Sequence, residues 1–249
     1  MKRLTPLFAA IVVCCSPSCS QATHTRVAES ASPSDYAELL KTYVTPEGVR
    51  YAAWHANKAD VDRMKKVAEF FASTTPPADR DASLAWHINA YNAWILNNIL
   101  KKYPTKGPLD GETLFFHGNR IVVSGEKTSF NNIEQKVIRP VFKDPRVHFA
   151  LNCASESCPP LQNKPFAAAS LDSDLERLAR AFINGNPHGV MLVPNAKTVK
   201  LSKIFEWYAD DFGGKGNQLK FINRYRQQPV PADARIEFFD YSWNLNQAR

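Results

Sequence analysis

A long apolar segment between Arg80 and Tyr103 limits the fold more than any other part of the chain. From Leu84 to Leu96 its residues are apolar on nearly every side of a helix. A helix without a polar face must be surrounded by the rest of the protein, so this segment predicts a long central helix. The side chains that we expect in the core are Trp86, Ile88, Ile95, Leu96, Phe149 and Leu151.

The polar residues inside this apolar helix are informative because burial makes them costly. Asn89 and Asn92 are three residues apart and therefore share a face of the helix. A buried amide without a partner costs about 1 to 3 kcal/mol. We therefore expect each amide to bind either the backbone or a residue of a functional site.

The remaining hydrophobic periodicity predicts an α+β fold with mostly antiparallel strands, in which the central helix packs on the sheet. No internal repeat and no second linker interrupt residues 34–249, which we interpret as one domain. Helices are predicted near 34–43, 57–74, 133–138, 171–183, 202–211 and 216–226, strands at 49–54, 147–152 and 236–239, and hairpins at 115–123, turning at Gly118-Asn119, and at 190–201.

The N-terminus is typical of an export signal. Met1-Lys2-Arg3 is followed by an unbroken apolar run from Leu7 to Cys15. The run is far shorter than the ~20 residues that span a bilayer as a helix. We predict a signal peptide over residues 1–22 and a flexible tether over 23–33, which places the protein in the periplasm.

Lipidation is an alternative outcome of the same signal. Cleavage after Ala22 would release the protein, whereas cleavage before Cys15 or Cys19 would leave a lipidated cysteine as a membrane tether at the cell envelope. The residues before either cysteine fit a lipobox poorly, and simple secretion remains the plainer interpretation.

Composition and charge exclude several classes of protein. The chain is 44% hydrophobic and 22% charged, which is typical of globular domains and excludes extensive disorder. Its net charge of +7 is spread along the chain without a basic stripe, so we predict no nucleic-acid partner. The sequence also lacks a phosphate loop, a nucleotide fingerprint and a serine elbow, and we expect no cofactor.

Two cysteines remain once the predicted signal is removed, and a histidine precedes them. Cys153 and Cys158 follow His148 in a segment where the small residues Ala154 and Ser155 leave room for a substrate. Thiol chemistry needs a thiolate, and a nearby imidazole lowers the thiol pKa. If 147–152 is a strand, His148 and Asn152 point to one face.

Other roles for these residues stay open. Two cysteines this close in an exported protein can form a small disulfide. A zinc site built from His148, Cys153 and Cys158 has too few ligands for a closed tetrahedron, so we predict no metal. His188 follows the cysteines in the order of papain-type enzymes but lies in a sequence typical of a surface turn, Asn186-Pro187-His188-Gly189.

Five motifs, in this order, resemble the domain-of-unknown-function 547 family over roughly residues 36–246. They are Trp86-His87-Ile88-Asn89-Ala90-Tyr91-Asn92, Phe130-Asn131-Asn132-Ile133-Glu134, Asp144–Cys153 with Ser157-Cys158-Pro159-Pro160, Leu201–Phe212, and Asp240-Tyr241-Ser242-Trp243-Asn244-Leu245-Asn246. The resemblance implies a single α+β domain with exported bacterial members and no settled activity. His87 departs from the apolar residue expected there.

The resemblance adds a positional argument. Polar residues within apolar surroundings fall in the matched motifs and would converge in a compact domain: Asn89, Tyr91, Asn92, Glu134, His148, Cys153, Cys158, Trp207, Tyr208 and Asp211. A helix bearing amides beside a strand bearing a histidine is a loose analogy to papain-like and transglutaminase-like proteins, which cannot assign a function.

These observations lead to two hypotheses. In the first, the protein is an exported thiol-dependent hydrolase or acyltransferase acting on a peptide-like or glutathione-like substrate. Cys153 or Cys158 is the nucleophile, His148 the base, and Asn89 or Asn92 the orienting or oxyanion-stabilising amide. The substrate-binding residues predicted for it are Tyr91, Glu134, Asn152, Ser155, Ser157 and Trp207. In the second, a Cys153–Cys158 disulfide shapes a non-catalytic pocket for a small molecule or peptide.

Overall fold

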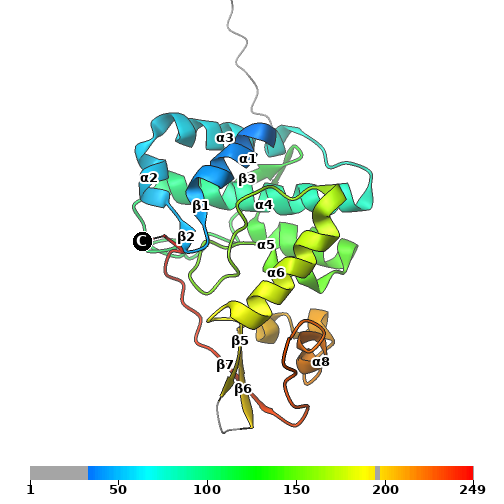
Figure 1. The fold of residues 1–249 in the computed structure, drawn as a ribbon. Helices are drawn as coiled ribbons and strands as arrows, with labels where there is room; N and C mark the ends of the chain where they lie inside the picture. The colour runs from blue at the N-terminus through cyan, green and yellow to red at the C-terminus, as the bar shows by residue number, and fades with distance from the viewer. Residues whose placement is uncertain (1–32, 194–196, 249) are drawn as a thin grey trace, which may run out of the picture.

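The computed structural model describes residues 33–193 and 197–248. The predicted signal peptide, the lipidation sites and nearly all of the tether therefore lie outside the described residues. Helices α1 to α4 gather at one end of the molecule and a small three-stranded sheet forms the other, with α6 between them (Figure 1). No helix in the described part of the chain has the length and apolar character needed to cross a membrane.

Helices account for most of the regular structure. The α-helices are α1 (Pro33–Tyr43), α2 (Tyr51–Ala56), α3 (Lys58–Ser73), α4 (Arg80–Lys102), α5 (Phe130–Asn132), α6 (Leu171–Gly185), α7 (Ile204–Trp207) and α8 (Gln218–Ile222). A π-helix, η1 (Ile133–Phe142), follows α5 directly, and three short 3₁₀ helices are η2 (Pro145–Phe149), η3 (Ala168–Ser170) and η4 (Ala209–Phe212).

Helix α4 is the predicted central helix. Asp79 caps its N-terminus by accepting a hydrogen bond from the backbone N–H of Ala82 at 2.8 Å. The positive charges of two lysines in its last turn interact favourably with the negative C-terminal end of the helix dipole. All six side chains expected in the core are buried: Trp86, Ile88, Ile95, Leu96, Phe149 and Leu151.

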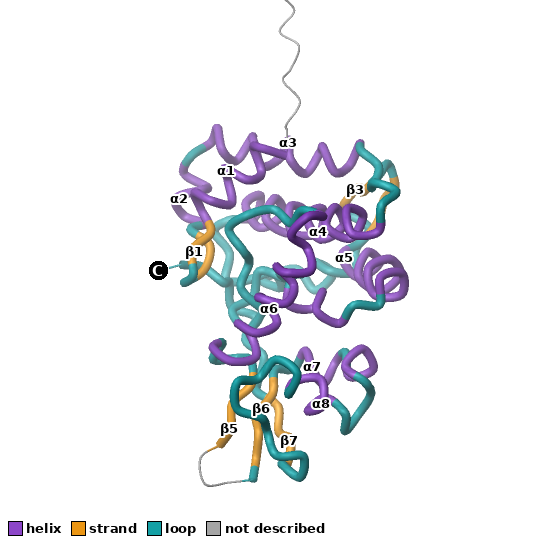
Figure 2. The backbone as a smooth tube through the Cα atoms, turned by 45° about the vertical axis from the view of Figure 1, so that its right-hand side comes forward, coloured by secondary structure: helices purple, strands orange, loops and turns teal. Residues whose placement is uncertain are grey.

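The strands form three small sheets, so the prediction of an α+β fold is confirmed but its layering is wrong. The pairs β1 (Val44–Thr45) with β2 (Gly48–Val49) and β3 (Ile121–Val123) with β4 (Glu126–Thr128) are antiparallel. In the third sheet, β6 (Thr198–Leu201) pairs antiparallel with β5 (Val190–Val193) and parallel with β7 (Arg235–Phe238). Helix α4 packs mainly on α3, η1 and η3, away from this sheet (Figure 2).

Two predicted strand regions are wrong for local reasons. Only Val49 of the predicted strand at 49–54 lies in a strand, β2, and Tyr51 and Trp54 are buried on one face of α2. Their spacing of three residues places both on one face of a helix but on opposite faces of a strand, so burial of both against one core favours the helix. The hairpin near 115–123 turns instead at Ser124 and Gly125, whose positive φ angles of 53° and 83° are those of the tight turns that hairpins favour.

The predicted strand at 147–152 is also wrong, and this correction matters most for the site. Pro145–Phe149 forms the 3₁₀ helix η2, which begins at Asp144 because its carboxylate accepts from the backbone N–H of Arg146 at 2.9 Å. An acidic cap followed by proline favours a helix start. His148 and Asn152 therefore do not share the face of a strand.

The helix predicted at 133–138 is longer than expected. It runs to Phe142 as the π-helix η1, with Pro140 inside it, and ends at Lys143, which has a left-handed φ of 52°. Proline lacks a backbone donor and normally breaks an α-helix. The wider turns of η1 continue past Pro140 and keep Glu134 and Arg139 on one element.

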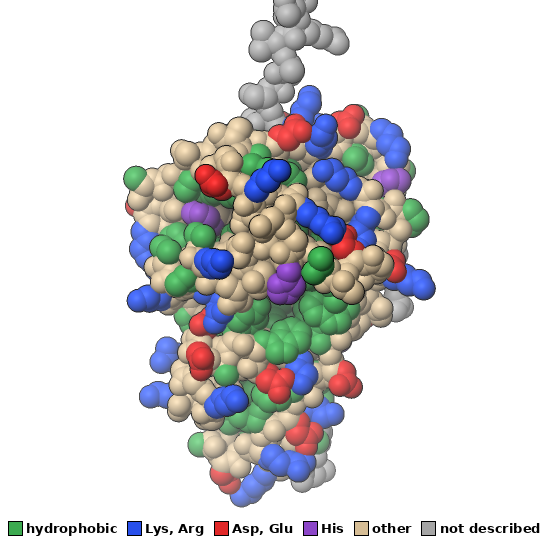
Figure 3. Space-filling model, turned by 180° about the vertical axis from the view of Figure 1, so that it is seen from behind, with side chains coloured by type: hydrophobic (Ala, Val, Ile, Leu, Met, Phe, Trp, Pro, Cys, Tyr) green, Lys and Arg blue, Asp and Glu red, His purple; other side chains and the backbone are tan. Residues whose placement is uncertain are grey.

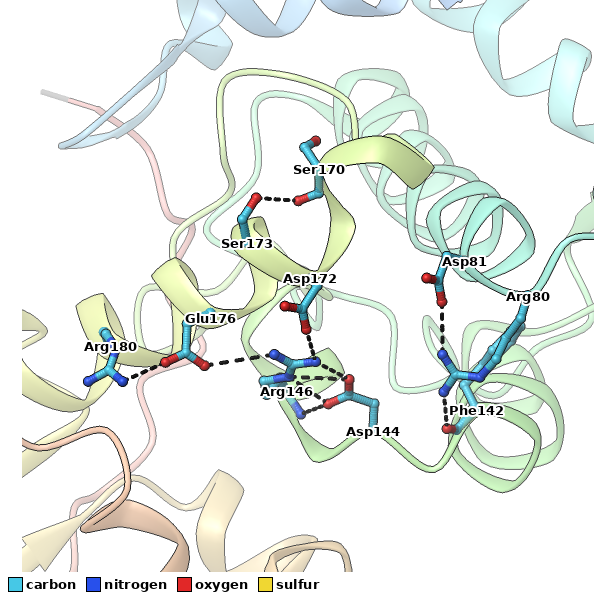
Figure 4. A network of polar contacts seen from close by, with 10 residues as sticks. All are labelled: Arg80, Asp81, Phe142, Asp144, Arg146, Ser170, Asp172, Ser173, Glu176 and Arg180. Atoms are coloured by element: carbon cyan, nitrogen blue, oxygen red, sulfur yellow. Dashed lines mark hydrogen bonds and ion pairs between the residues drawn. The ribbon is translucent and has the colours of Figure 1, made fainter.

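Arg146 fixes η2 against α6. Its guanidinium donates to the carboxylate of Asp144 at 2.7 Å and to that of Asp172 at 2.8 Å, and it lies 3.8 Å from Glu176 (Figure 4). Bidentate contacts between arginine and carboxylates are directional. This network therefore sets the position of η2, which carries His148.

Candidate active site

Segments distant in the sequence converge on one pocket of about 250 Å³. Six of the predicted site residues line it: Tyr91, Glu134, His148, Cys153, Cys158 and Trp207. They come from α4, η1, η2, the loop after η2, and α7. On the face shown in Figure 3, hydrophobic side chains gather around a hollow across the middle of the molecule.

His148 is held by a carboxylate behind the pocket. Its Nε2 donates to Asp211 Oδ2 at 2.7 Å, and its ring is 4% exposed. Because a carboxylate only accepts, Nε2 carries a proton and the neutral ring has its lone pair on Nδ1. Nδ1 lies 3.8 Å from the pocket-lining carboxylate of Glu134. Nδ1 is therefore the atom that can take up a proton, and Glu134 would stabilise the resulting imidazolium.

Asp211 is fixed in turn by an arginine. Arg139 donates to both carboxylate oxygens of Asp211, at 2.6 and 2.9 Å. Burial raises the pKa of Asp211, but the hydrogen bonds from His148 and Arg139 outweigh it and hold the pKa well below its ordinary value. Tyr208 stacks on the His148 ring with centroids 4.0 Å apart, which restricts rotation of the imidazole.

Cys153 occupies a polar corner of the pocket. Its Sγ lies 2.9 Å from Ser155 Oγ and 3.2 Å from Tyr241 Oη, and the Ser155 hydroxyl donates to Tyr241 at 2.9 Å. The proton of Tyr241 is then free to point at the sulfur. Burial raises the pKa of Cys153, but Cys158, Ser155 and Tyr241 stabilise the thiolate and lower the pKa to about 7.

Cys158 has the opposite character. It is buried, its sulfur accepts from the backbone N–H of Cys153 at 3.0 Å, and its thiol faces the carbonyl of Leu151 at 3.6 Å. Burial and the neighbouring Cys153 raise the pKa of Cys158 well above its ordinary value. Both cysteines are free thiols, so the disulfide of the second hypothesis is not a feature of this structure.

The amides of α4 position the cysteine loop and do not line the pocket. Asn92 donates to the carbonyl of Ala150 at 2.9 Å and accepts from the backbone N–H of Asn152 at 2.9 Å. Asn89 makes the same pair of bonds to the backbone of Phe166, at 2.8 and 2.9 Å. Neither amide has the placement expected of an oxyanion donor.

Three further predicted residues support the loop from within. Asn152 donates to the carbonyl of Pro159 and accepts from the backbone N–H of Ala154. Ser155 is fully buried beside Cys153, whereas the Ser157 hydroxyl accepts from the backbone N–H of Ser242. Ala154 has a left-handed φ of 63°, a conformation uncommon outside glycine, and it turns the chain sharply after Cys153.

The other histidines lie elsewhere. His87 binds the carbonyl of Ser83 through Nδ1 at 2.7 Å. His188 lies 3.5 Å from Ser157 Oγ in a second pocket of about 430 Å³, which shares Cys158 with the first. No group of three or more histidine, cysteine and acidic side chains in the described residues is arranged to hold a metal ion.

Sequence reasoning missed the groups contributed by the C-terminal segment. Tyr241 and Trp243 from this segment line the pocket. Arg139 of η1 was missed as well, although Asp211, which it holds behind the pocket, was among the residues expected to converge. The loop after Cys153 is held to this segment by the backbone, since the N–H of Glu156 donates to the carbonyl of Asn244 and the N–H of Asn246 donates to that of Ala154. The motif around Tyr241 was the available signal, but nothing in it indicated contact with Cys153.

The arrangement places an ionisable thiol and a carboxylate-bound imidazole on the walls of one small pocket. No hydrogen bond joins His148 to Cys153 among the contacts of the described residues. The thiolate is stabilised by hydroxyls and a second thiol, which leaves the imidazole available for proton transfer to or from a bound molecule.

Comparison with known proteins gives one match. Residues 77–183 match the family described as "Protein of unknown function, DUF547". No curated protein and no solved structure matches the chain, so the analogy to papain-like proteins gains no support. The matched residues contain Glu134, His148, Cys153 and Cys158, so this part of the chain is similar to that family.

Proposed function

We propose that the protein is an exported cysteine-dependent hydrolase or acyltransferase that acts on a peptide-like substrate. Cys153 is the nucleophile, His148 the general acid and base, and Asp211 the group that orients His148. The observation that carries the proposal is that Cys153, with a pKa lowered to about 7, opens onto the same pocket as His148.

The residues favour Cys153 over Cys158 as nucleophile. A thiol whose pKa is near 7 is substantially ionised at neutral pH, whereas Cys158 stays protonated. Cys153 is also the more exposed of the two. Cys158 then serves the reaction by stabilising the Cys153 thiolate.

The chemistry divides into two steps. In the reacting form Cys153 is a thiolate and His148 carries a second proton at Nδ1, beside Glu134. The thiolate attacks the carbonyl carbon of the substrate and forms a C–S bond, and the bond to the leaving group breaks as His148 donates that Nδ1 proton to the group. Water or an amine then attacks the thioester, His148 Nδ1 takes the proton of the attacking group, and the C–S bond breaks to restore the thiolate. Tyr241 can donate to the carbonyl oxygen while negative charge develops there.

Acylation by p-nitrophenyl acetate tests this assignment directly. Brief exposure at pH 7.5, about half a unit above the lowered thiol pKa, should place one acetyl group on Cys153, located by peptide mass spectrometry. Cys153→Ser should lose the adduct, while the matched control Cys158→Ser should keep it. His148→Ala should accumulate the adduct, because deacylation loses its base.

Other labelling patterns would contradict the proposal. Acetyl groups confined to lysines, or found on Cys158 when Cys153 is present, would remove Cys153 as the nucleophile. Deacylation at the same rate in His148→Ala and in the control His188→Ala would remove His148 as the base.

A further inference from the structure

The mouth of the pocket is built from aromatic rings. We call Phe116, Trp207, Tyr241 and Trp243 the aromatic rim. Trp207 and Tyr241 have ring centroids 4.8 Å apart, Tyr241 and Trp243 also 4.8 Å, and Phe116 and Trp243 5.8 Å. Trp207 is 48% exposed although it is a large hydrophobic residue. Such rings expose π-faces that attract cations as well as apolar groups.

Carboxylates outnumber cationic side chains around the pocket. Glu134 lines it with a side chain that is 12% exposed, and Asp211 lies just behind it. The one arginine beside them, Arg139, gives two donors to Asp211 and a third to Gln135. No lysine or arginine lines this pocket among the described residues.

This balance of charge selects the ligand. Glu134 and Asp211 contribute two negative charges and Arg139 one positive charge, so the cluster is negative whenever His148 is neutral. Ionisation of Cys153 adds a further negative charge. A carboxylate-bearing ligand would be repelled here and would find no lysine or arginine in the described lining, whereas an ammonium group would be attracted to Glu134 and to the aromatic rim.

We infer that the pocket binds a molecule that carries a protonated primary amine, with the ammonium group between Glu134 and the aromatic rim. The inference rests on the proposed function in taking the bound molecule as the substrate, and it narrows that substrate to cationic, lysine-like amides. A glutathione-like substrate is disfavoured because its two carboxylates would meet Glu134 and no lysine or arginine in the described lining of the pocket.

Calorimetric titration with three blocked amino acid amides tests the inference. N-acetyl-lysinamide, N-acetyl-norleucinamide and N-acetyl-glutamamide have similar lengths and differ in charge. The full chain should bind the lysine compound about tenfold more tightly than the norleucine compound. The glutamate compound should bind most weakly.

Two variants and one control locate the preference. Glu134→Gln and Trp207→Ala should each reduce the preference for the lysine compound over the norleucine compound to about threefold or less. Trp207 is exposed, so its replacement keeps the test valid if Glu134→Gln does not fold. Glu206→Gln removes a neighbouring exposed carboxylate outside the pocket and should leave the preference unchanged. Equal or tighter binding of the norleucine or glutamate compound, or an unchanged lysine preference in both pocket variants, would overturn the inference.

The outcome is separable from that of the proposed function. The same titrations on Cys153→Ser measure binding without a nucleophile. A lysine preference without acetylation of Cys153 would refute the enzyme while supporting the cationic pocket. Acetylation of Cys153 without a lysine preference would support the enzyme and refute the cationic pocket.

Discussion

Tyr241 contacts Cys153 across 88 residues of sequence, and its hydroxyl is one of the groups that stabilise the thiolate. The larger effects on this thiol are burial, which raises its pKa, and Cys158 and Ser155, which lower it. The pocket therefore depends on hydroxyl and thiol donors where the sequence had indicated an imidazole.

Tyr241→Phe removes one donor and keeps the ring in the aromatic rim. Alkylation of Cys153 by iodoacetamide should then have its midpoint about one pH unit above that of the original protein, because a hydrogen bond to the thiolate is lost. The measurement is the alkylation rate between pH 5 and 10. An unchanged midpoint would show that the Tyr241 hydroxyl does not stabilise the thiolate. Tyr103→Phe, outside the pocket, serves as the control and should leave the midpoint unchanged.

Asp211→Asn tests the ion pair behind His148. The folded pKa of Asp211 lies below its ordinary value of 3.8, so its stabilising effect is fully present above that pH and is lost as the pH falls. The variant should unfold about 1 to 2 kcal/mol more easily at pH 7, allowing for partial exposure.

Urea unfolding at neutral and acidic pH checks the sign of this effect. The difference between the variant and the original protein should shrink as the pH falls below about 4. A difference that stays constant with pH would show that the carboxylate charge is not responsible. Asp210→Asn alters the exposed neighbour and should have little effect at any pH.

At the scale of elements, α4 was predictable because its apolar pattern is continuous over the whole helix. The 3₁₀ helix η2 was not predictable, and of the π-helix η1 only the helical start at 133–138 was. The helix η2 is short and is decided by its Asp144 cap, so it has no hydrophobic period of its own, and the apolar pattern of η1 did not indicate π geometry or an extension past Pro140. The polar residues of α4 illustrate both cases, since their need for partners was predictable and the identity of those partners was not.

Leu96→Ala tests the central position of α4. Leu96 is 1% exposed, and its truncation should lower the free energy of unfolding by about 2 to 5 kcal/mol because a cavity remains. Thermal and urea unfolding measure the loss. Leu114→Ala, at a position 54% exposed, should change stability by no more than about 0.5 kcal/mol. Equal stability of the two variants would contradict a central α4.

At the scale of the whole molecule, the site extends beyond the residues that match the family. The DUF547 match ends at residue 183, whereas Asp211, Trp207 and Tyr241 come from later in the chain. The C-terminal segment returns to the cysteine loop and completes the pocket. An isolated 77–183 fragment would therefore lack the orienting carboxylate and most of the aromatic rim.

Export makes a prediction for the intact chain. The charged start and apolar run predict that the first fifteen to twenty-two residues are removed. Mass spectrometry of the mature N-terminus should find a start after Ala22, or a diacylglyceryl group on Cys15 or Cys19. An intact Met1 in the membrane fraction would refute cleavage.

The sequence alone determined the central helix, the buried residues, the α+β class and the group Glu134, His148, Cys153 and Cys158, because hydrophobic period and residue chemistry are local properties. Only the tertiary structure decided what surrounds them. His148 lies in the helix η2 and not in the predicted strand, and the amides of Asn89 and Asn92 bind the backbone. Asp211 and Tyr241 contact His148 and Cys153 at the pocket. These contacts join residues far apart in the chain, and their pairing depends on how the core packs, which no local pattern contains.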